Sequence, residues 1–209
     1  MYNFAQKTER DKRAVERRKA AAMEVFSGYW KLRAIADGLL NLDRQIDEEY
    51  KQADAAGLNH LLPCEKVGPF VGANHDYQTL DAKELVFLFD QKKADLVGEI
   101  DLLTRRAKNI DAVLVQYNQL KASLGDFNER NSEEVVLHEG TRATIQFSGK
   151  YGRFADLRRG VLNNLLGQLQ HFLEGDLKEA LRVADAYLEA AKLEYSSDFP
   201  EFKHEWSQS

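Results

Sequence analysis

The sequence has few of the residues that crosslink a chain or break helices. It contains one cysteine and three prolines among 209 residues. Cys64 alone cannot form an internal disulfide, which excludes the disulfide-stapled folds of many small secreted domains. Since prolines are rare and 30% of the residues are charged, the composition favours long helices with solvated faces.

Long apolar runs and phosphate-binding glycine motifs are also absent. No stretch approaches the roughly 18 consecutive apolar residues that a membrane-spanning helix needs, and the first residues lack the apolar core of a signal peptide. Neither GxGxxG nor GxxxxGK[ST] occurs. We therefore expect a cytoplasmic protein without a bound cofactor. Association with a membrane surface is the alternative, because a basic helical start often follows a membrane segment.

Charge is unevenly distributed along the chain. The formal net charge is -5, yet residues 1–20 carry seven basic and three acidic side chains, or +4. A basic arm on an acidic body is typical of contact with nucleic acid or an anionic membrane, here through residues 7–19. The competing interpretation is a solvated helix start, because the acidic residues are interspersed. The arm residues that we single out are Arg10, Arg13, Arg17 and Arg18.

The first helix is predicted over residues 8–56. Apolar residues recur along it with the alternating three-and-four spacing of a coiled-coil seam, and Gly57 ends it. Gly28 and Gly38 each weaken this helix by about 1 kcal/mol relative to alanine. They either permit the close approach of a neighbouring segment or are simply tolerated.

A second long helix is predicted over residues 82–124. Asp81 and Glu84 have the spacing of a capping box at its start, and Gly125 follows its end. Apolar residues repeat every seven positions from Ala82 to Leu124 without a break. Two helices of similar length joined by a connector over 57–81 indicate an antiparallel, coiled-coil-like helical hairpin that forms a first domain, residues 1–125.

The period changes after the second helix. Residues 126–132 resemble a hinge, and residues 133–147 alternate between apolar and polar side chains around a three-residue loop, which predicts a small β-hairpin. Helical spacing returns over 151–173 and, after the break expected at Gly175, over 177–195. The predicted fold class is thus mainly α: a long helical hairpin, then a second domain over 126–209 made of a β-hairpin and a C-terminal helix pair.

The connector holds the only candidate metal ligands. His60, Cys64, His75 and Asp76 offer donor atoms that suit zinc, although their spacing matches no structural zinc motif. The competing interpretation is a loop with a buried thiol and ordinary histidines. A metal-dependent enzyme that uses residues 58–80 is therefore the third hypothesis for function, and we expect that the chain is not an enzyme.

The first hypothesis is a helical interaction or scaffold protein. The predicted helical hairpin contains more aromatic residues than a two-helix seam can bury, and tyrosine and tryptophan are common interface anchors. A two-helix hairpin rarely makes a sufficient core, so self-association is expected as well. The second hypothesis is a binder of nucleic acid or anionic membranes through the basic arm. The candidate interaction residues are Tyr29, Trp30, Tyr50, Phe87, Leu96, Leu103 and Tyr117.

Overall fold

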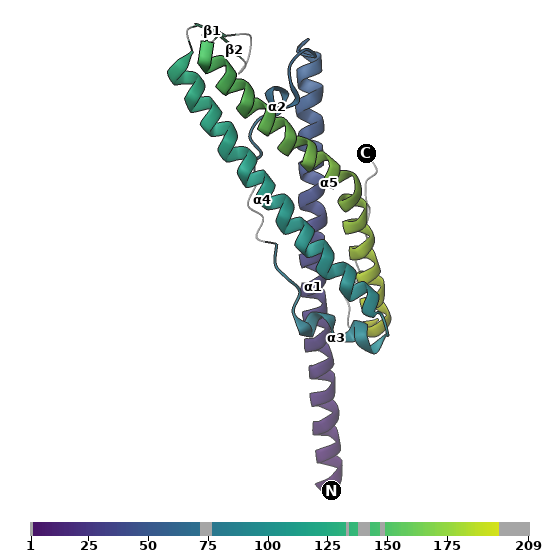
Figure 1. The fold of residues 1–209 in the computed structure, drawn as a ribbon. Coiled ribbons are helices and arrows are strands. Elements are labelled where there is room, and N and C mark those ends of the chain that lie inside the picture. Colours follow the sequence, from purple (N-terminus) through teal and green to yellow (C-terminus); the bar gives the residue numbers. More distant parts are fainter. Residues whose placement is uncertain (1, 72–76, 133, 138–142, 147–148, 197–209) are drawn as a thin grey trace. The chain divides into compact units, whose positions relative to one another are not determined.

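The computed structural model describes residues 2–71, 77–132, 134–137, 143–146 and 149–196 (Figure 1). Three long helices dominate it: α1 (Tyr2–Ala55), α4 (Ala94–Asn131) and α5 (Gly149–Tyr195). Two short helices, α2 (Pro63–Lys66) and α3 (Ala82–Asp90), lie in the chain between α1 and α4. The mainly helical architecture expected from the sequence is confirmed.

The helix α1 follows the sequence closely. It runs for 54 residues and stops just before Gly57, which has a φ of 68°. Glycine adopts this left-handed conformation without the steric cost that a side chain brings, and the Leu58 N–H closes onto the Ala53 carbonyl oxygen at 2.9 Å. The predicted end of the first helix is therefore confirmed to within one or two residues.

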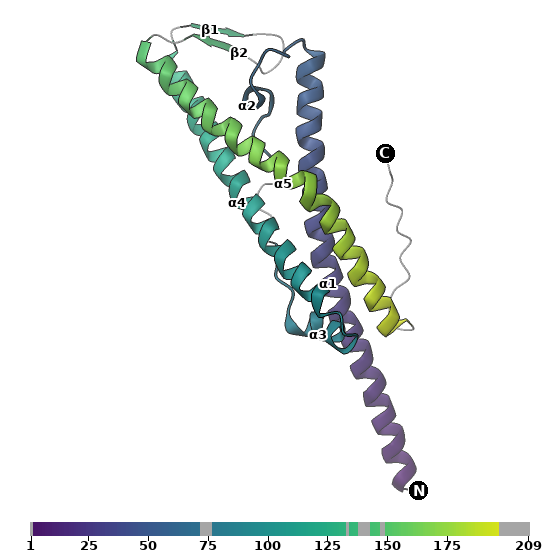
Figure 2. The same cartoon turned by 45° about the vertical axis from the view of Figure 1, so that its right-hand side comes forward.

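The predicted antiparallel pairing of the first two long helices is wrong. The Tyr187 hydroxyl of α5 donates a hydrogen bond to the Val25 carbonyl oxygen of α1, and Arg18 of α1 donates one to the Glu194 carbonyl oxygen of α5. These two helices therefore run in opposite directions. Arg182 of α5 donates a hydrogen bond to Glu99 of α4, and Gln91, just before α4, donates one to the Ala190 carbonyl oxygen of α5. The helices α4 and α5 are therefore also antiparallel. It follows that α1 and α4 run in the same direction, as both ribbon views show (Figures 1 and 2).

The connector explains how two parallel helices can follow one another in the chain. An extended segment advances about 3.3 Å per residue, so the roughly 25 residues of the connector can reach back along a long helix. The antiparallel pair is instead α4 with α5, which meet through Arg106 and Asp176 as well as through Ser123 and Arg158. Sequence spacing located the helical segments but not their directions.

The second predicted helix is in fact two helices. The chain leaves the helical path at residues 91–93, where Lys92 has a φ of 58°. The Lys92 N–H donates to the Phe89 carbonyl and the Lys93 N–H to the Leu88 carbonyl, which closes the end of α3 as a left-handed cap does. The sequence did not predict this cap, because the residue with the left-handed conformation is a lysine and not the usual glycine. At the other end, α4 continues through Gly125 and the predicted hinge to Asn131.

The predicted C-terminal helix pair is one helix. α5 runs unbroken for 47 residues through Gly175. A glycine costs a helix only about 1 kcal/mol, and burial of its neighbour Leu173 offsets that cost. Asp176 and Glu179 also have the spacing of a capping box, but Asp176 lies inside the continuous helix and its carboxylate pairs with Arg106 at 2.9 Å.

The predicted β-hairpin does not form a substantial part of the fold, and this prediction is wrong. The described residues contain only two four-residue strands, β1 (Glu134–Leu137) and β2 (Ala143–Gln146), with Val135 opposite Ile145. Residues 133, 138–142 and 147 of the predicted range lie outside the described residues. A two-stranded ladder of this size is marginal by itself, so the described chain is a helical protein with no β domain.

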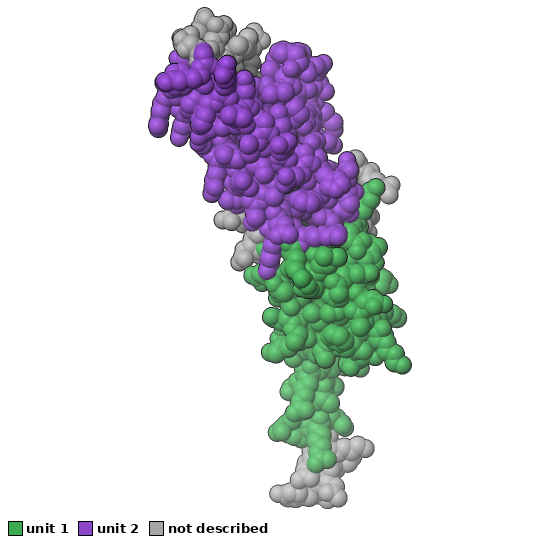
Figure 3. Space-filling view, in the orientation of Figure 1, with its two compact units in different colours: residues 1–36, 77–105, 178–209 green, residues 37–76, 106–177 purple. Residues whose placement is uncertain are grey.

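Contacts divide the chain into two compact units (Figure 3). Unit 1 comprises residues 1–36, 77–105 and 178–209, and unit 2 comprises residues 37–76 and 106–177. Each unit takes a part of all three long helices. The sequence predicted two domains, residues 1–125 and 126–209. That division concerns which segments fold independently, and it stays a prediction.

Each unit has its own aromatic centre. In unit 1 the rings of Phe87 and Tyr187 meet edge-on at 5.3 Å. In unit 2 the rings of Phe70 and Tyr117 lie 5.1 Å apart. Tyr187 is fully buried, and its hydroxyl lies 2.7 Å from the Glu84 carbonyl oxygen and 3.0 Å from that of Val25. α5 thus supplies the third helix that a two-helix core would lack.

Candidate binding surfaces

The basic arm is an exposed stretch of α1. All side chains from residue 9 to residue 20 are exposed, and this set includes the four predicted arm residues Arg10, Arg13, Arg17 and Arg18. Arg13 pairs with Glu9 one turn away at 3.0 Å, and Arg18 donates to the Glu194 carbonyl oxygen at 2.9 Å. A helix with so few tertiary contacts is only marginally stable in water, so a binding partner that covers this arm would stabilise it.

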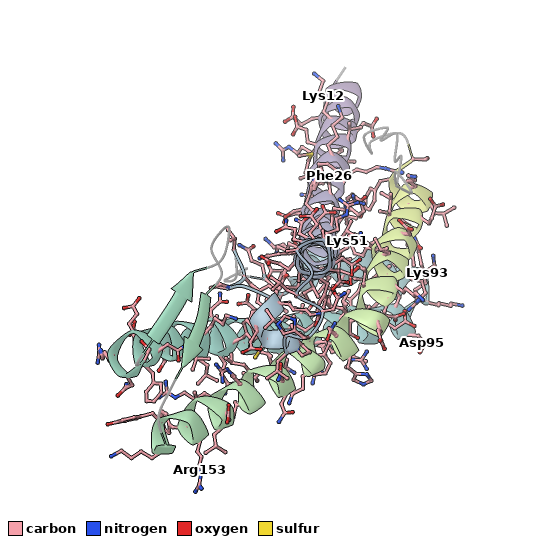
Figure 4. All side chains as sticks on the ribbon, turned by 90° about the horizontal axis from the view of Figure 1, so that it is seen from above. Lys12, Phe26, Lys51, Lys93, Asp95 and Arg153 are labelled. Atoms are coloured by element: carbon pink, nitrogen blue, oxygen red, sulfur yellow. The ribbon has the colours of Figure 1, made fainter. Side chains whose placement is uncertain are left out.

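Basic and apolar side chains share one face of α1. Six residues at spacings of three and four lie on this face, and we call them the α1 strip: Lys12, Val15, Lys19, Met23, Phe26 and Trp30. Val15 is 54%, Met23 60% and Trp30 49% exposed, while Phe26 is half-buried and meets the Trp30 ring edge-on at 5.8 Å. Lys12 and Phe26 are labelled on this helix in Figure 4. The strip contains two lysines and no carboxylate.

Most of the predicted interaction residues lie in the core instead. Tyr29, Phe87 and Tyr117 are at most 1% exposed, Leu96 and Leu103 are buried, and Tyr50 is half-buried. The prediction assumed that only a two-helix seam could bury these aromatic side chains, whereas α3, α5 and the connector also cover them. Among the seven, Trp30 is the one with a large exposed surface, and an interface role for the others stays a prediction.

Only two of the four predicted metal ligands lie among the described residues, so the metal site stays a prediction. His60 is exposed, whereas Cys64 is 1% exposed, and His75 and Asp76 lie outside the described residues. The described His, Cys, Asp and Glu side chains form no group of three that could hold a metal ion.

Cys64 has a structural environment. Its backbone N–H donates to Asn163 Oδ1 at 2.8 Å, and its Sγ donates to the Arg159 carbonyl oxygen at 3.6 Å. Burial raises the pKa of the Cys64 thiol, and the positive charge of Lys121 opposes this shift only in part. A protonated thiol is a weaker nucleophile and metal ligand than a thiolate, and the two hydrogen bonds of Cys64 anchor the connector to α5.

Two further side chains fix the connector to α4. Asn118 accepts a hydrogen bond from the Phe70 N–H at 2.8 Å and donates to the Phe70 carbonyl at 2.9 Å. Lys121 donates to the carbonyl oxygens of Cys64 and Val67, and burial lowers its pKa. These bonds satisfy backbone groups of an irregular segment that would otherwise lose their hydrogen bonds to water.

A pocket lies beside His171 in unit 2. Its lining includes Arg106, Asn109, Phe172 and Asp176. Arg106 is already paired with Asp176 at 2.9 Å, and the two acidic residues of the lining, Glu174 and Asp176, offset its charge. The lining residues include no serine, threonine or cysteine, and the paired charges of Arg106 and Asp176 do not favour an anion.

Part of the exposed face of α5 is apolar. Phe154, Leu157 and Val161 fall on the helical spacing that predicts a helix over 151–173, and they are 43%, 70% and 46% exposed. The buried residues of this stretch include Ala155, Leu162 and Leu165. The signal was present in the sequence, because apolar residues on this helix span more than one face.

None of the helices in the described part of the chain combines the length and apolar character that crossing a bilayer takes. Compared with known proteins, the chain matches no family model, no curated protein and no solved structure. Its function therefore has to be argued from the surfaces described above.

Proposed function

We propose that the chain is a helical interaction protein that binds an acidic partner protein through the α1 strip. The observation that carries this proposal is the exposure of Met23 and Trp30 on the same helical face as Lys12 and Lys19. Aromatic and methionine side chains are enriched in the centres of protein interfaces. A single exposed apolar residue is ordinary, but several in register along one helix indicate a contact surface.

The dimensions of the strip suit a partner helix. From Lys12 to Trp30 the strip covers 18 helical steps, or about 27 Å. Its spacing of three and four residues is the pattern by which one helix packs along another. Trp30 and Met23 would supply the apolar anchors, and the two lysines would steer an acidic partner into place.

Charge argues against a parallel second copy of the same strip as the partner. Two copies aligned in parallel would place Lys12 opposite Lys12 and Lys19 opposite Lys19, which is repulsive. A partner with carboxylates beside its apolar residues turns those repulsions into attractions.

The basic arm supports a second candidate function. Arg10 and Arg17 lie on the side of α1 away from the strip, and both are exposed. Arginines on an exposed helix bind phosphate groups of nucleic acids or anionic lipids. This candidate predicts that binding depends on Arg10 and Arg17 and weakens steeply with salt, whereas the strip proposal predicts dependence on Met23 and Trp30.

The test is affinity capture from nuclease-treated extracts of the source cells, with four forms of the chain. The Met23→Ser/Trp30→Ser variant is compared with wild type, with the matched control Leu193→Ser, and with Arg10→Glu/Arg17→Glu. Leu193 is 74% exposed but lies outside the strip. We expect one protein to bind wild type and Leu193→Ser, and its yield to fall at least tenfold with the strip variant.

The outcomes separate the two candidates. Equal capture of every protein by wild type and the strip variant would overturn the proposal. Capture of nucleic acid or anionic vesicles that only Arg10→Glu/Arg17→Glu abolishes would establish the second candidate instead. Circular dichroism of each variant shows whether a loss of binding comes from a loss of helix.

A further inference from the structure

The last residues of the sequence have a chemistry that complements the α1 strip. Residues 197–209, which we call the 197–209 segment, lie outside the described residues. Their sequence, SDFPEFKHEWSQS, holds three carboxylates and one lysine, whereas the α1 strip holds two lysines and no carboxylate. The segment also contains three aromatic residues at the spacing of three and four positions that the strip has at Met23, Phe26 and Trp30: Phe199, Phe202 and Trp206.

The last described residues lie beside the strip. The helix α5 stops at Tyr195, and the next residue lies in a turn. At this end of α5 the Arg18 guanidinium donates to the Glu194 carbonyl oxygen at 2.9 Å, and Lys19 of the strip follows Arg18 in α1. Both helix segments belong to unit 1, and they lie side by side in both ribbon views (Figures 1 and 2). The 197–209 segment therefore begins next to the helical turn that carries Lys19.

A short connection is enough to bring the aromatic residues onto the strip. One residue along a helix turns the side chain by about 100°, so Lys19 points about a quarter of a turn away from the side of α1 that faces α5. The four steps from Tyr195 to Phe199 span up to about 13 Å when extended, which exceeds the usual spacing of about 8–10 Å between packed helix axes. The steps from Phe199 to Trp206 cover about 10 Å as a helix and about 23 Å when extended, against about 17 Å from Lys19 to Trp30.

The other segments outside the described residues do not have this chemistry. Residues 72–76 and 138–142 contain no aromatic side chain, and the segment of Phe147 contains no carboxylate. Because the 197–209 segment is tethered beside the strip, its local concentration there is on the order of millimolar. Charge complementarity and the tether therefore select the same occupant.

We propose that the 197–209 segment binds the α1 strip of its own chain between Lys19 and Trp30. Its aromatic rings contact the side chains of Met23 and Trp30, and its first two carboxylates pair with Lys19. Met23 is 60% and Trp30 49% exposed, so the contact removes apolar surface from water. The carboxylates fix the direction in which the segment approaches, because the positive charge lies at one end of this stretch.

The contact regulates the site at which the acidic partner binds. The partner and the segment use the same lysine and the same apolar side chains, so they exclude one another. This consequence, unlike the docking itself, rests on the proposed function. A contact with an intrinsic dissociation constant of about 100 μM, at a local concentration of about 1 mM, leaves about one chain in ten uncovered. The apparent affinity for the partner falls by that factor.

Carbodiimide coupling of the unaltered full chain tests the docking. This reagent joins a lysine amine to a carboxylate in direct contact with it, with loss of water. Peptide mass spectrometry of the monomer fraction should find Lys19 joined to Asp198 or Glu201, at least about tenfold more often than Lys92, since the tether favours the docked pair. Lys92 is the matched control because it is exposed and lies next to the residue that bonds α5 at Ala190. Equal coupling to Lys92, or none to Lys19, would overturn the proposal.

Tryptophan fluorescence gives a second readout of the docking. The chain has two tryptophans, so Trp30→Phe leaves Trp206 as the sole reporter. Acrylamide should quench Trp206 at least about threefold less in this variant than after the further change Met23→Ser, because the docked ring is shielded from water. Phe89→Ser should leave quenching unchanged, since Phe89 is 56% exposed but lies on α3. Quenching that Met23→Ser does not alter would overturn the contact.

Capture from extracts of the source cells separates this proposal from the proposed function. The full chain with Phe199→Ser/Phe202→Ser/Trp206→Ser keeps the strip but loses its occupant, so the yield of the acidic partner should rise about tenfold. An unchanged yield would overturn the competition. If no form of the chain captures a partner, the proposed function fails, while the coupling and quenching results still decide whether the segment docks.

Discussion

Replacing Gly28 by alanine should destabilise the protein, although alanine is the better helix former. A Cβ at this position would lie 2.4 Å from the Tyr187 hydroxyl oxygen and 3.1 Å from the Glu84 Cβ. The first distance is far below van der Waals contact, so Tyr187 has to move and its hydroxyl leaves the carbonyl oxygens of Val25 and Glu84. The sequence left open whether Gly28 permits close approach, and the structure shows that it does.

The expected magnitude combines three effects. Alanine gains about 1 kcal/mol in helix propensity. Overpacking of a core costs about 1–3 kcal/mol, and a lost buried hydrogen bond costs about 1–2 kcal/mol more. We therefore expect Gly28→Ala to lower the free energy of unfolding by about 1–4 kcal/mol. Tyr187→Phe alone should lower it by about 1–2 kcal/mol, because only the hydrogen bonds are lost.

The double variant makes the argument testable. Gly28→Ala/Tyr187→Phe lacks the oxygen at 2.4 Å, so the two changes should cost at least about 1 kcal/mol less together than the sum of the single changes. Urea unfolding followed by circular dichroism gives all three values. Additivity within about 0.5 kcal/mol, or a Gly28→Ala variant more stable than wild type, would refute the assigned contact.

Two further predictions concern titratable groups. Burial raises the pKa of both Tyr117 and Tyr187, so above about pH 10 the unfolded chain loses these phenolic protons first. Stability should then fall by up to about 1.4 kcal/mol per pH unit for each tyrosine. Tyr187→Phe should make this fall shallower in urea titrations at pH 10–11.5, and an unchanged slope would contradict the assignment. Cys64 should resist a thiol reagent until the connector opens. Asn118→Ala removes two hydrogen bonds to the connector and should speed labelling of Cys64 about tenfold. Equal labelling rates in wild type and the variant would show that Asn118 does not hold the connector closed.

The candidate surfaces were predictable only in part. Positive charge on residues 7–19 is a property of composition, and the described side chains of this stretch, residues 9–19, are exposed. Trp30 was singled out and is exposed, but Tyr29 beside it fills the core. One residue along a helix turns the side chain by about 100°, so choosing between such neighbours requires knowing where the covering helices lie.

The sequence by itself determined where most of the chain is helical. Local spacing, the glycine after α1 and the basic composition of the arm act over a few residues, and tertiary structure left them unchanged. Only tertiary structure decided the direction of α4, the cap at Lys92 and the continuity of α5 through Gly175. Each of these choices involves about 1–2 kcal/mol locally, and burial of side chains such as Tyr187 and Leu173 contributes more than that. Packing between distant segments therefore overrides the local preference, and the local sequence carries no record of it.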